Sequence, residues 1–136
     1  CTLSIEITNL FNISGNVAVV TGGSRGFGEM ITAGFLANGV KVYISARKAP
    51  ALIEKAKELS EKYNQECIPV PCDLSLMDGI DEFVHQIAGK EDSIDFLINN
   101  AGLLINKTFD KITVNDFKKI YDVMKSIRQL ITAIQA

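Results

Sequence analysis

The sequence has no tryptophan and no large excess of either charge, with 14 Lys and Arg against 16 Asp and Glu and a net charge of −2. The basic residues are scattered, so nothing indicates a nucleic-acid surface. No apolar run approaches the ~20 residues that a membrane helix needs, and no basic stretch followed by an apolar core marks a signal peptide. We therefore expect a cytoplasmic protein without nucleic-acid or membrane partners.

Few residues could bind a metal. Cys1, Cys67 and Cys72 are an odd number without metal-ligand spacing, and the last two flank a predicted strand. Small buried thiols in a reducing compartment are the simplest interpretation. His85 has no second ligand nearby and is expected to be structural or exposed, so the sequence predicts no metal site.

Apolar residues are plentiful enough for one core, because the 136 residues are 47% hydrophobic and 22% charged. Such values are typical of a single globular domain, which we expect to span residues 1–136. Short β-branched runs alternate with longer helical patterns. The predicted strands are 17–20, 40–45, 67–71 and 94–98, and the first is a continuous apolar run that is typical of a strand buried on both faces.

A helix is predicted after each strand, from apolar residues at helical spacing. Asn38-Gly39 should end the first helix, and Pro50 suits the first turn of the second. Capping boxes at 75–78 and 113–116 should begin the third and fourth. This β-α alternation with short connections predicts an α/β fold of three layers, a Rossmann-type parallel sheet with strand order 3-2-1-4.

The turn at 21–28, which reads TGGSRGFG, joins the first strand to the first helix. Gly22 should allow the tight turn, Gly26 the close approach of a ligand, and Gly28 the close packing of the helix on the strand. A helix N-terminus with free N–H groups behind such a turn binds a pyrophosphate. The position in an α/β series favours a dinucleotide site over a tight turn without a ligand.

The end of the second strand indicates which dinucleotide is bound. Sheets that prefer NAD(H) place an acidic residue there to hold the ribose 2′-hydroxyl. This chain has Ala46 followed by Arg47, and Arg25 lies in the glycine turn. A guanidinium binds a 2′-phosphate by charge and paired hydrogen bonds. NADP(H) is therefore the expected cofactor, with NAD(H) the weaker candidate.

Three motifs resemble those of the short-chain dehydrogenase/reductase family. They are the TGxxxGxG form at 21–28, Cys72-Asp73-Leu74 after the third strand, and NNAG at 99–102 after the fourth. The resemblance runs from about Phe11 to Ser126. The stretches GVKVYISARK and CDLS look like the ketoreductase branch, which includes members similar to gluconate 5-dehydrogenase and 3-oxoacyl reductase.

The resemblance implies a role for each matching position. Asp73 would accept a hydrogen bond from the adenine amine and Leu74 would pack near the ring. The residues after the fourth strand would line the ribose side, with Asn99 bracing the sheet. The implied cofactor-binding residues are Gly22, Ser24, Arg25, Gly26, Phe27, Gly28, Arg47, Asp73, Leu74, Asn100, Ala101 and Gly102; of these, Ser24, Arg25 and Arg47 would surround the 2′-phosphate.

The catalytic residues of the family lie further along the chain. Relatives use a Ser and a Tyr-x-x-x-Lys pair, which lies many tens of residues after NNAG, together with an Asn on the helix that follows NNAG. Tyr121 to Lys125 fits Tyr-x-x-x-Lys, and Thr108 lies about where a hydroxyl partner would. The match comes too early, and Tyr121 falls on the apolar stripe of a helix, so a core or interface residue is expected. Where relatives read Asp-x-Asn-x-Lys-Ser, residues 122–126 are one residue short and lack the Asn. We assign no catalytic residue.

These observations imply the cofactor-binding half of an NADP(H)-dependent oxidoreductase that interconverts a carbonyl and an alcohol. This part alone is expected to be inactive. One alternative is a truncated, non-catalytic form that binds nucleotide or dimerises, and another is a product that does not fold stably. The apolar stripe of the helix at 114–134 predicts a homo-oligomer, and a sheet that ends at its fourth strand would expose an edge.

Overall fold

The computed structural model describes residues 7–102, 108–119, 121 and 122. The elements in chain order are α1 (Ile7–Leu10), β1 (Val17–Thr21), α2 (Gly26–Ala37), β2 (Lys41–Ala46), α3 (Ala49–Tyr63), β3 (Cys67–Pro71), α4 (Met77–Ala88), β4 (Phe96–Ile98) and a 3-10 turn (Phe109–Lys111). Residues 114–119 are also helical. The predicted alternation of strands and helices is confirmed through β4.

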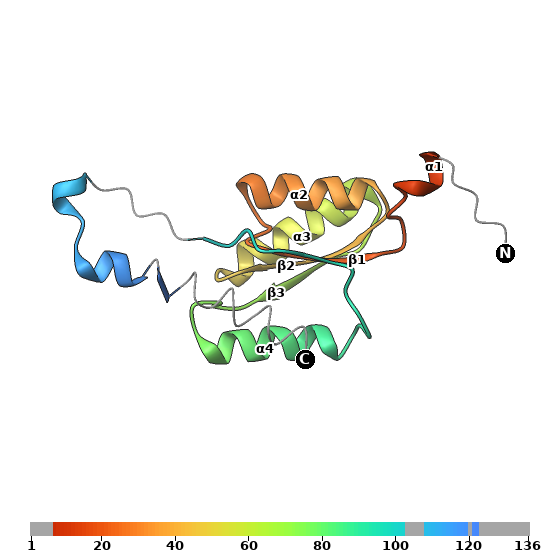
Figure 1. Cartoon of the computed structure of the whole chain (residues 1–136). Helices are drawn as coiled ribbons and strands as arrows, with labels where there is room; N and C mark the ends of the chain where they lie inside the picture. The colour runs from red at the N-terminus through yellow and green to blue at the C-terminus, as the bar shows by residue number, and fades with distance from the viewer. Residues whose placement is uncertain (1–6, 103–107, 120, 123–136) are drawn as a thin grey trace.

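The four strands form one parallel sheet in the order β3-β2-β1-β4, as predicted. Helices α2 and α3 lie on one face and α4 on the other, so the molecule has three layers (Figure 1). Each face has its own apolar core. The two cores separate because neighbouring residues of β1 point to opposite faces: Val20 packs with Leu36 and Leu52, whereas Val19 packs with Phe83.

Three of the four residues or motifs predicted to begin or end a helix do so in the structure. Gly39 follows α2 with φ of +76°, Pro50 lies in the first turn of α3, and Thr113 and Asp116 bond reciprocally. The capping box predicted at 75–78 is wrong. Leu76 precedes α4 without a side-chain cap, because the Ser75 hydroxyl donates to Asp73 Oδ1 at 2.6 Å instead.

None of the helices in the described residues is long and apolar enough to cross a membrane. The described residues also hold no cluster of His, Cys, Asp and Glu that could bind a metal. Cys67 is buried and Cys72 half-buried, both as free thiols, and His85 is exposed. Cys1 lies outside the described residues.

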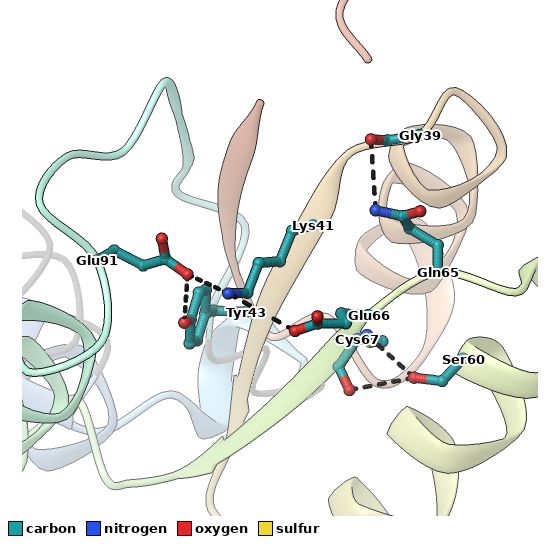
Figure 2. A network of polar contacts seen from close by, with 8 residues as sticks. All are labelled: Gly39, Lys41, Tyr43, Ser60, Gln65, Glu66, Cys67 and Glu91. Carbon is teal, nitrogen blue, oxygen red and sulfur yellow. Dashed lines mark hydrogen bonds and ion pairs between the residues drawn. The ribbon is translucent and has the colours of Figure 1, made fainter. Parts of the chain in front are cut away.

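A polar network joins the start of β2 to the loop after α4 (Figure 2). The hydroxyl of the fully buried Tyr43 donates to Glu91 Oε1 at 2.7 Å, and Lys41 Nζ forms an ion pair with the same carboxylate oxygen. Burial and the Glu91 hydrogen bond raise the pKa of Tyr43 to about 12. Hydrogen bonds from Lys41 and then Tyr43 lower the pKa of Glu91, so this carboxylate stays ionised at neutral pH.

Substituting Glu91→Gln is expected to remove about 1 kcal/mol of unfolding free energy at neutral pH. The native pKa of Glu91 is lower than its unfolded value, so its stabilisation is present above the unfolded pKa and is lost as the pH falls through the native pKa. Urea midpoints measured from pH 3 to pH 8 should therefore converge for the two proteins in acid.

The matched control is Glu61→Gln, which removes an exposed carboxylate 4.0 Å from Lys57. Exposed ion pairs of this kind contribute little, so its urea midpoints should follow those of the parent. A Glu91→Gln protein that differs from the parent by the same amount at every pH would contradict the role given to the ionised carboxylate.

Candidate functional site

A cavity of about 830 Å³ opens where the carboxyl ends of the strands meet. It lies beside β1, where the chain changes direction across the sheet: β2 and β3 lie on one side of β1 and β4 on the other. Such switch points form the ligand crevices of open α/β sheets. Its lining residues are Gly22, Ser24, Arg25, Gly26, Ser45, Ala46, Arg47, Cys72, Asp73, Leu74, Ser75, Leu76, Asn100, Ala101, Gly102, Lys119 and Asp122.

The turn between β1 and α2 lines the cavity with backbone. Gly22 and Gly26 have φ of +66° and +58°, a left-handed conformation that favours glycine. A Cβ at Gly26 would meet nothing within 4 Å, so the turn leaves space there for a ligand. Arg25 precedes α2 without a side-chain cap, so its side chain does not occupy the N–H groups of the first turn.

Gly28 holds the start of α2 against the end of β1. A Cβ there would lie 2.1 Å from the Gly22 carbonyl oxygen and 2.5 Å from Asn100 Nδ2. The close helix–strand packing predicted for Gly28 is therefore present. The helix cannot approach this closely with a side chain at that position, so the glycine sets the position of the N–H groups that face the cavity.

Thr21, at the end of β1, ties the loop after β4 to the glycine turn. Its fully buried hydroxyl accepts hydrogen bonds from the N–H groups of Asn100 and Ala101, both at 3.0 Å, and donates to the Ile98 carbonyl at 3.3 Å. Thr21 was not among the residues predicted to bind the cofactor. A hydroxyl at the end of an otherwise apolar strand was the available signal, because a buried hydroxyl needs partners.

The bracing role expected for Asn99 belongs to Asn100. Asn99 is exposed, whereas Asn100 Nδ2 lies 3.2 Å from the carbonyl oxygens of both Thr21 and Gly22 and donates to them. Asn100 therefore braces the sheet and also lines the cavity. The two adjacent asparagines differ because successive residues of an extended chain point in opposite directions.

Charged residues line the side of the cavity next to β2 and β3. Arg25 and Arg47 both line it and are exposed, and Ala46 stands where an acidic residue would bind a 2′-hydroxyl. Asp73 Oδ1 accepts from the Ser75 hydroxyl and from its N–H, at 2.6 and 3.0 Å. These bonds, the hydroxyl first, and the charge of Arg47 lower the pKa of Asp73. The site therefore offers two cations and one ionised acceptor.

Cys72 and Ser45 also line the cavity and were not predicted to do so. Burial, reinforced by the negative charge of Asp73, raises the pKa of the Cys72 thiol to about 12. The thiol is thus protonated near neutral pH and is not a nucleophile. Lys119 and Asp122, from the segment after the 3-10 turn, complete the described wall.

Two of the predicted cofactor-binding residues do not line the cavity. Gly28 lies behind the turn, and Phe27 is 77% exposed and absent from the cavity wall. Tyr121 is 62% exposed rather than part of the core and does not line the cavity either, while Lys125 lies outside the described residues. The described walls can bind a phosphorylated adenosine through N–H groups, guanidinium groups and a carboxylate, and they contain no Tyr–Lys pair.

Comparison with known proteins identifies a family for this chain. The model of the short chain dehydrogenase family matches residues 16–134. The rhamnolipids biosynthesis 3-oxoacyl-[acyl-carrier-protein] reductase of Pseudomonas aeruginosa is 34% identical over 130 residues, which are 92% of this chain and 50% of the reductase. The chain therefore spans about half the length of this relative.

Solved structures share both the fold and this proportion. The RhlG/NADP active-site complex of Pseudomonas aeruginosa superimposes with a TM-score of 0.86 at 33% identity, over 92% of this chain and 48% of that one. L-sorbose reductase from Gluconobacter frateurii, complexed with NADPH and L-sorbose, gives 0.83 at 30% identity, over 90% and 47%.

Proposed function

The chain belongs to the short-chain dehydrogenase family, and on that premise we propose that it forms the NADP(H)-binding part of an oxidoreductase that interconverts a small-molecule carbonyl and an alcohol. The observation that carries the proposal is the cavity at the carboxyl ends of the strands, with Arg25 and Arg47 in its wall and Ala46 in place of an acid. Several similar structures contain NADP or NADPH, which supports the same choice of cofactor.

Each wall of the cavity fits one part of the proposed cofactor. The glycine turn and the N-terminus of α2 would hold the pyrophosphate. Ser24, Arg25 and Arg47 would surround the 2′-phosphate. Residues 100–102 would line the riboses, and Leu74 would pack near the adenine. Asp73 would accept from the adenine amine, since Ser75 occupies only its Oδ1.

In this proposal, the catalytic residues lie outside the described part of the chain. Bound NADPH supplies the hydride. This chain's own residues hold the cofactor and fix its orientation, and we assign proton transfer to a Tyr-x-x-x-Lys pair and a Ser of the type that relatives carry. The resemblance to ketoreductases, together with the similarity to a 3-oxoacyl reductase, favours a small or medium ketone or alcohol as the substrate.

Substituting Arg47→Ala is expected to lower the affinity for NADPH at least about tenfold and the affinity for NADH only slightly, through long-range charge. The reason is that a charge-assisted hydrogen bond to the 2′-phosphate contributes about 1.5–3 kcal/mol and NADH has no such phosphate. Dissociation constants can be measured by the fluorescence of the reduced nicotinamide in titrations with both dinucleotides.

Lys48→Ala is the matched control, because Lys48 is an exposed cation next to Arg47 that does not line the cavity. It should lower the two affinities little and equally, through long-range charge alone. Equal losses for NADPH and NADH in Arg47→Ala would contradict recognition of the 2′-phosphate, and tighter binding of NADH by the parent protein would reject the proposed cofactor.

A second candidate function is a non-catalytic form that binds nucleotide and associates through the helix that the sequence predicts at 114–134. The observation that favours it is an apolar stripe: Val114, Phe117 and Tyr121 are 88%, 73% and 62% exposed. Ile120, Met124, Ile127 and Ile131, which extend the predicted stripe, lie outside the described residues. Phe117→Glu should then reduce the mass measured by light scattering without changing NADPH affinity, whereas an unchanged mass would argue against association through this helix.

A further inference from the structure

Strand β3 ends the sheet on one side. Within the described part of the chain, β3 pairs with β2 along one edge and no strand pairs with its other edge. An edge strand normally presents a row of N–H and C=O groups to which a strand of another molecule can add. The free groups on this edge therefore decide whether a second copy of the chain can bind there.

The hydrogen bonds to β2 show which residues of β3 face outward. The Val42 N–H donates to the Glu66 carbonyl at 3.0 Å, and the Cys72 N–H donates to the Ala46 carbonyl at 3.1 Å. In a parallel pair, alternate residues of a strand direct both backbone groups to the same neighbour. Every second residue from Glu66 to Cys72 therefore faces β2. The outward-facing residues are Cys67, Pro69 and Pro71.

None of these three residues has an N–H group available to a partner. Pro69 and Pro71 have none at all. The Cys67 N–H donates to Ser60 Oγ at 3.0 Å, and the same hydroxyl lies 3.3 Å from the Cys67 carbonyl oxygen, to which it donates (Figure 2). Ser60, in the last turn of α3, thus occupies both backbone groups of Cys67. The edge retains only the carbonyl oxygens of the two prolines.

We propose that Pro69, Pro71 and the Ser60 hydroxyl close the outer edge of β3, so that a second copy of this chain cannot add a strand there. A strand pair needs donors and acceptors from both partners in alternation. Because the outer edge of β3 offers acceptors and no donors, the hydrogen bonds that β3 N–H groups would donate to a partner strand cannot form. Self-association of the protein is therefore directed to surfaces other than β3, and this holds whether or not the site binds NADP(H).

The test restores the missing groups in the whole protein. The triple variant Ser60→Ala, Pro69→Val and Pro71→Val presents three free N–H groups along β3. We expect its weight-average mass in sedimentation equilibrium to rise to at least about twice that of the parent as concentration increases. In hydrogen exchange, the new amides at 69 and 71 should become protected as concentration rises.

Pro50→Val is the matched control, because Pro50 is the remaining proline of the three in the sequence and lies in the first turn of α3. It should sediment like the parent. The double variant Pro69→Val with Pro71→Val keeps the Ser60 bonds and should associate more weakly than the triple variant. It also provides the decisive measurement if the triple variant does not fold.

Two results would overturn the proposal. One is a folded triple or double variant that keeps the parent's mass at every concentration, with amides 69 and 71 exchanging freely. The other is association without any protection of those amides, because the new contact would then lie elsewhere. NADPH titration of the same samples separates this result from the proposed function, since Ser60, Pro69 and Pro71 do not line the cavity.

Discussion

Substituting Gly28→Ala is expected to lower the unfolding free energy by at least about 3 kcal/mol and to abolish measurable nucleotide binding. The new Cβ would lie 2.1 Å from the Gly22 carbonyl oxygen and 2.5 Å from Asn100 Nδ2. The turn cannot retreat easily, because the Gly22 N–H donates to the Ser45 carbonyl at 2.9 Å and the Gly22 carbonyl accepts from Asn100. The start of α2 would have to shift, and with it the N–H groups that face the cavity.

The measurement is urea unfolding followed by circular dichroism, with NADPH titration of the same protein. Gly34→Ala is the matched control, because Gly34 lies in the same helix, is exposed, and leaves open space for a methyl group, which would meet nothing within 4 Å. Alanine is the better helix former, so this variant should gain about 0.5–1 kcal/mol and bind NADPH like the parent. Equal stability of the two variants would mean that the close contact at Gly28 is relieved without cost.

The sheet order and the position of the cavity could be predicted because they depend on short-range patterns. A buried parallel strand is a nearly continuous apolar run, as at residues 17–20, and parallel strands joined by helical connections are linked by right-handed crossovers. The position of the glycine turn could also be predicted from a short-range pattern. Gly22 and Gly26 adopt left-handed backbone conformations, which the residue type itself indicates.

The wrong predictions concern choices between neighbouring polar groups. Ser75 could have capped α4, but Asp73 two residues earlier offered a carboxylate at 2.6 Å. Asn99 and Asn100 have the same side chain, and only the direction of each residue at the end of β4 decides that Asn100 reaches the carbonyls of Thr21 and Gly22. Such choices depend on which partner the fold brings within hydrogen-bonding distance, and the spacing of residues along the chain does not contain that information.

Thr21 shows the same dependence, and its substitution gives the second large expected effect. Thr21→Val keeps the shape of a fully buried side chain and removes the acceptor for the N–H groups of Asn100 and Ala101. The Asn100 N–H keeps the Ile98 carbonyl as an acceptor at 3.1 Å, whereas the Ala101 N–H loses its partner, at a cost of about 1–3 kcal/mol. We expect a loss of about 1–3 kcal/mol in urea unfolding, and at least about tenfold weaker NADPH binding, because both residues line the cavity.

Thr32→Val is the matched control for this loss. Its hydroxyl is equally buried, but it only donates to the Gly28 carbonyl one helical turn earlier, at 2.8 Å. That carbonyl keeps its helical N–H partner, so about 1 kcal/mol or less should be lost.

Thr21→Ser retains the hydroxyl and should recover most of the NADPH affinity. If Thr21→Val and Thr32→Val lost the same stability and both bound NADPH normally, the hydroxyl of Thr21 would be an ordinary buried polar group. If only Thr21→Val lost affinity and serine restored it, the end of β1 would set the position of the loop after β4, and the glycine turn and that loop would act as one binding surface.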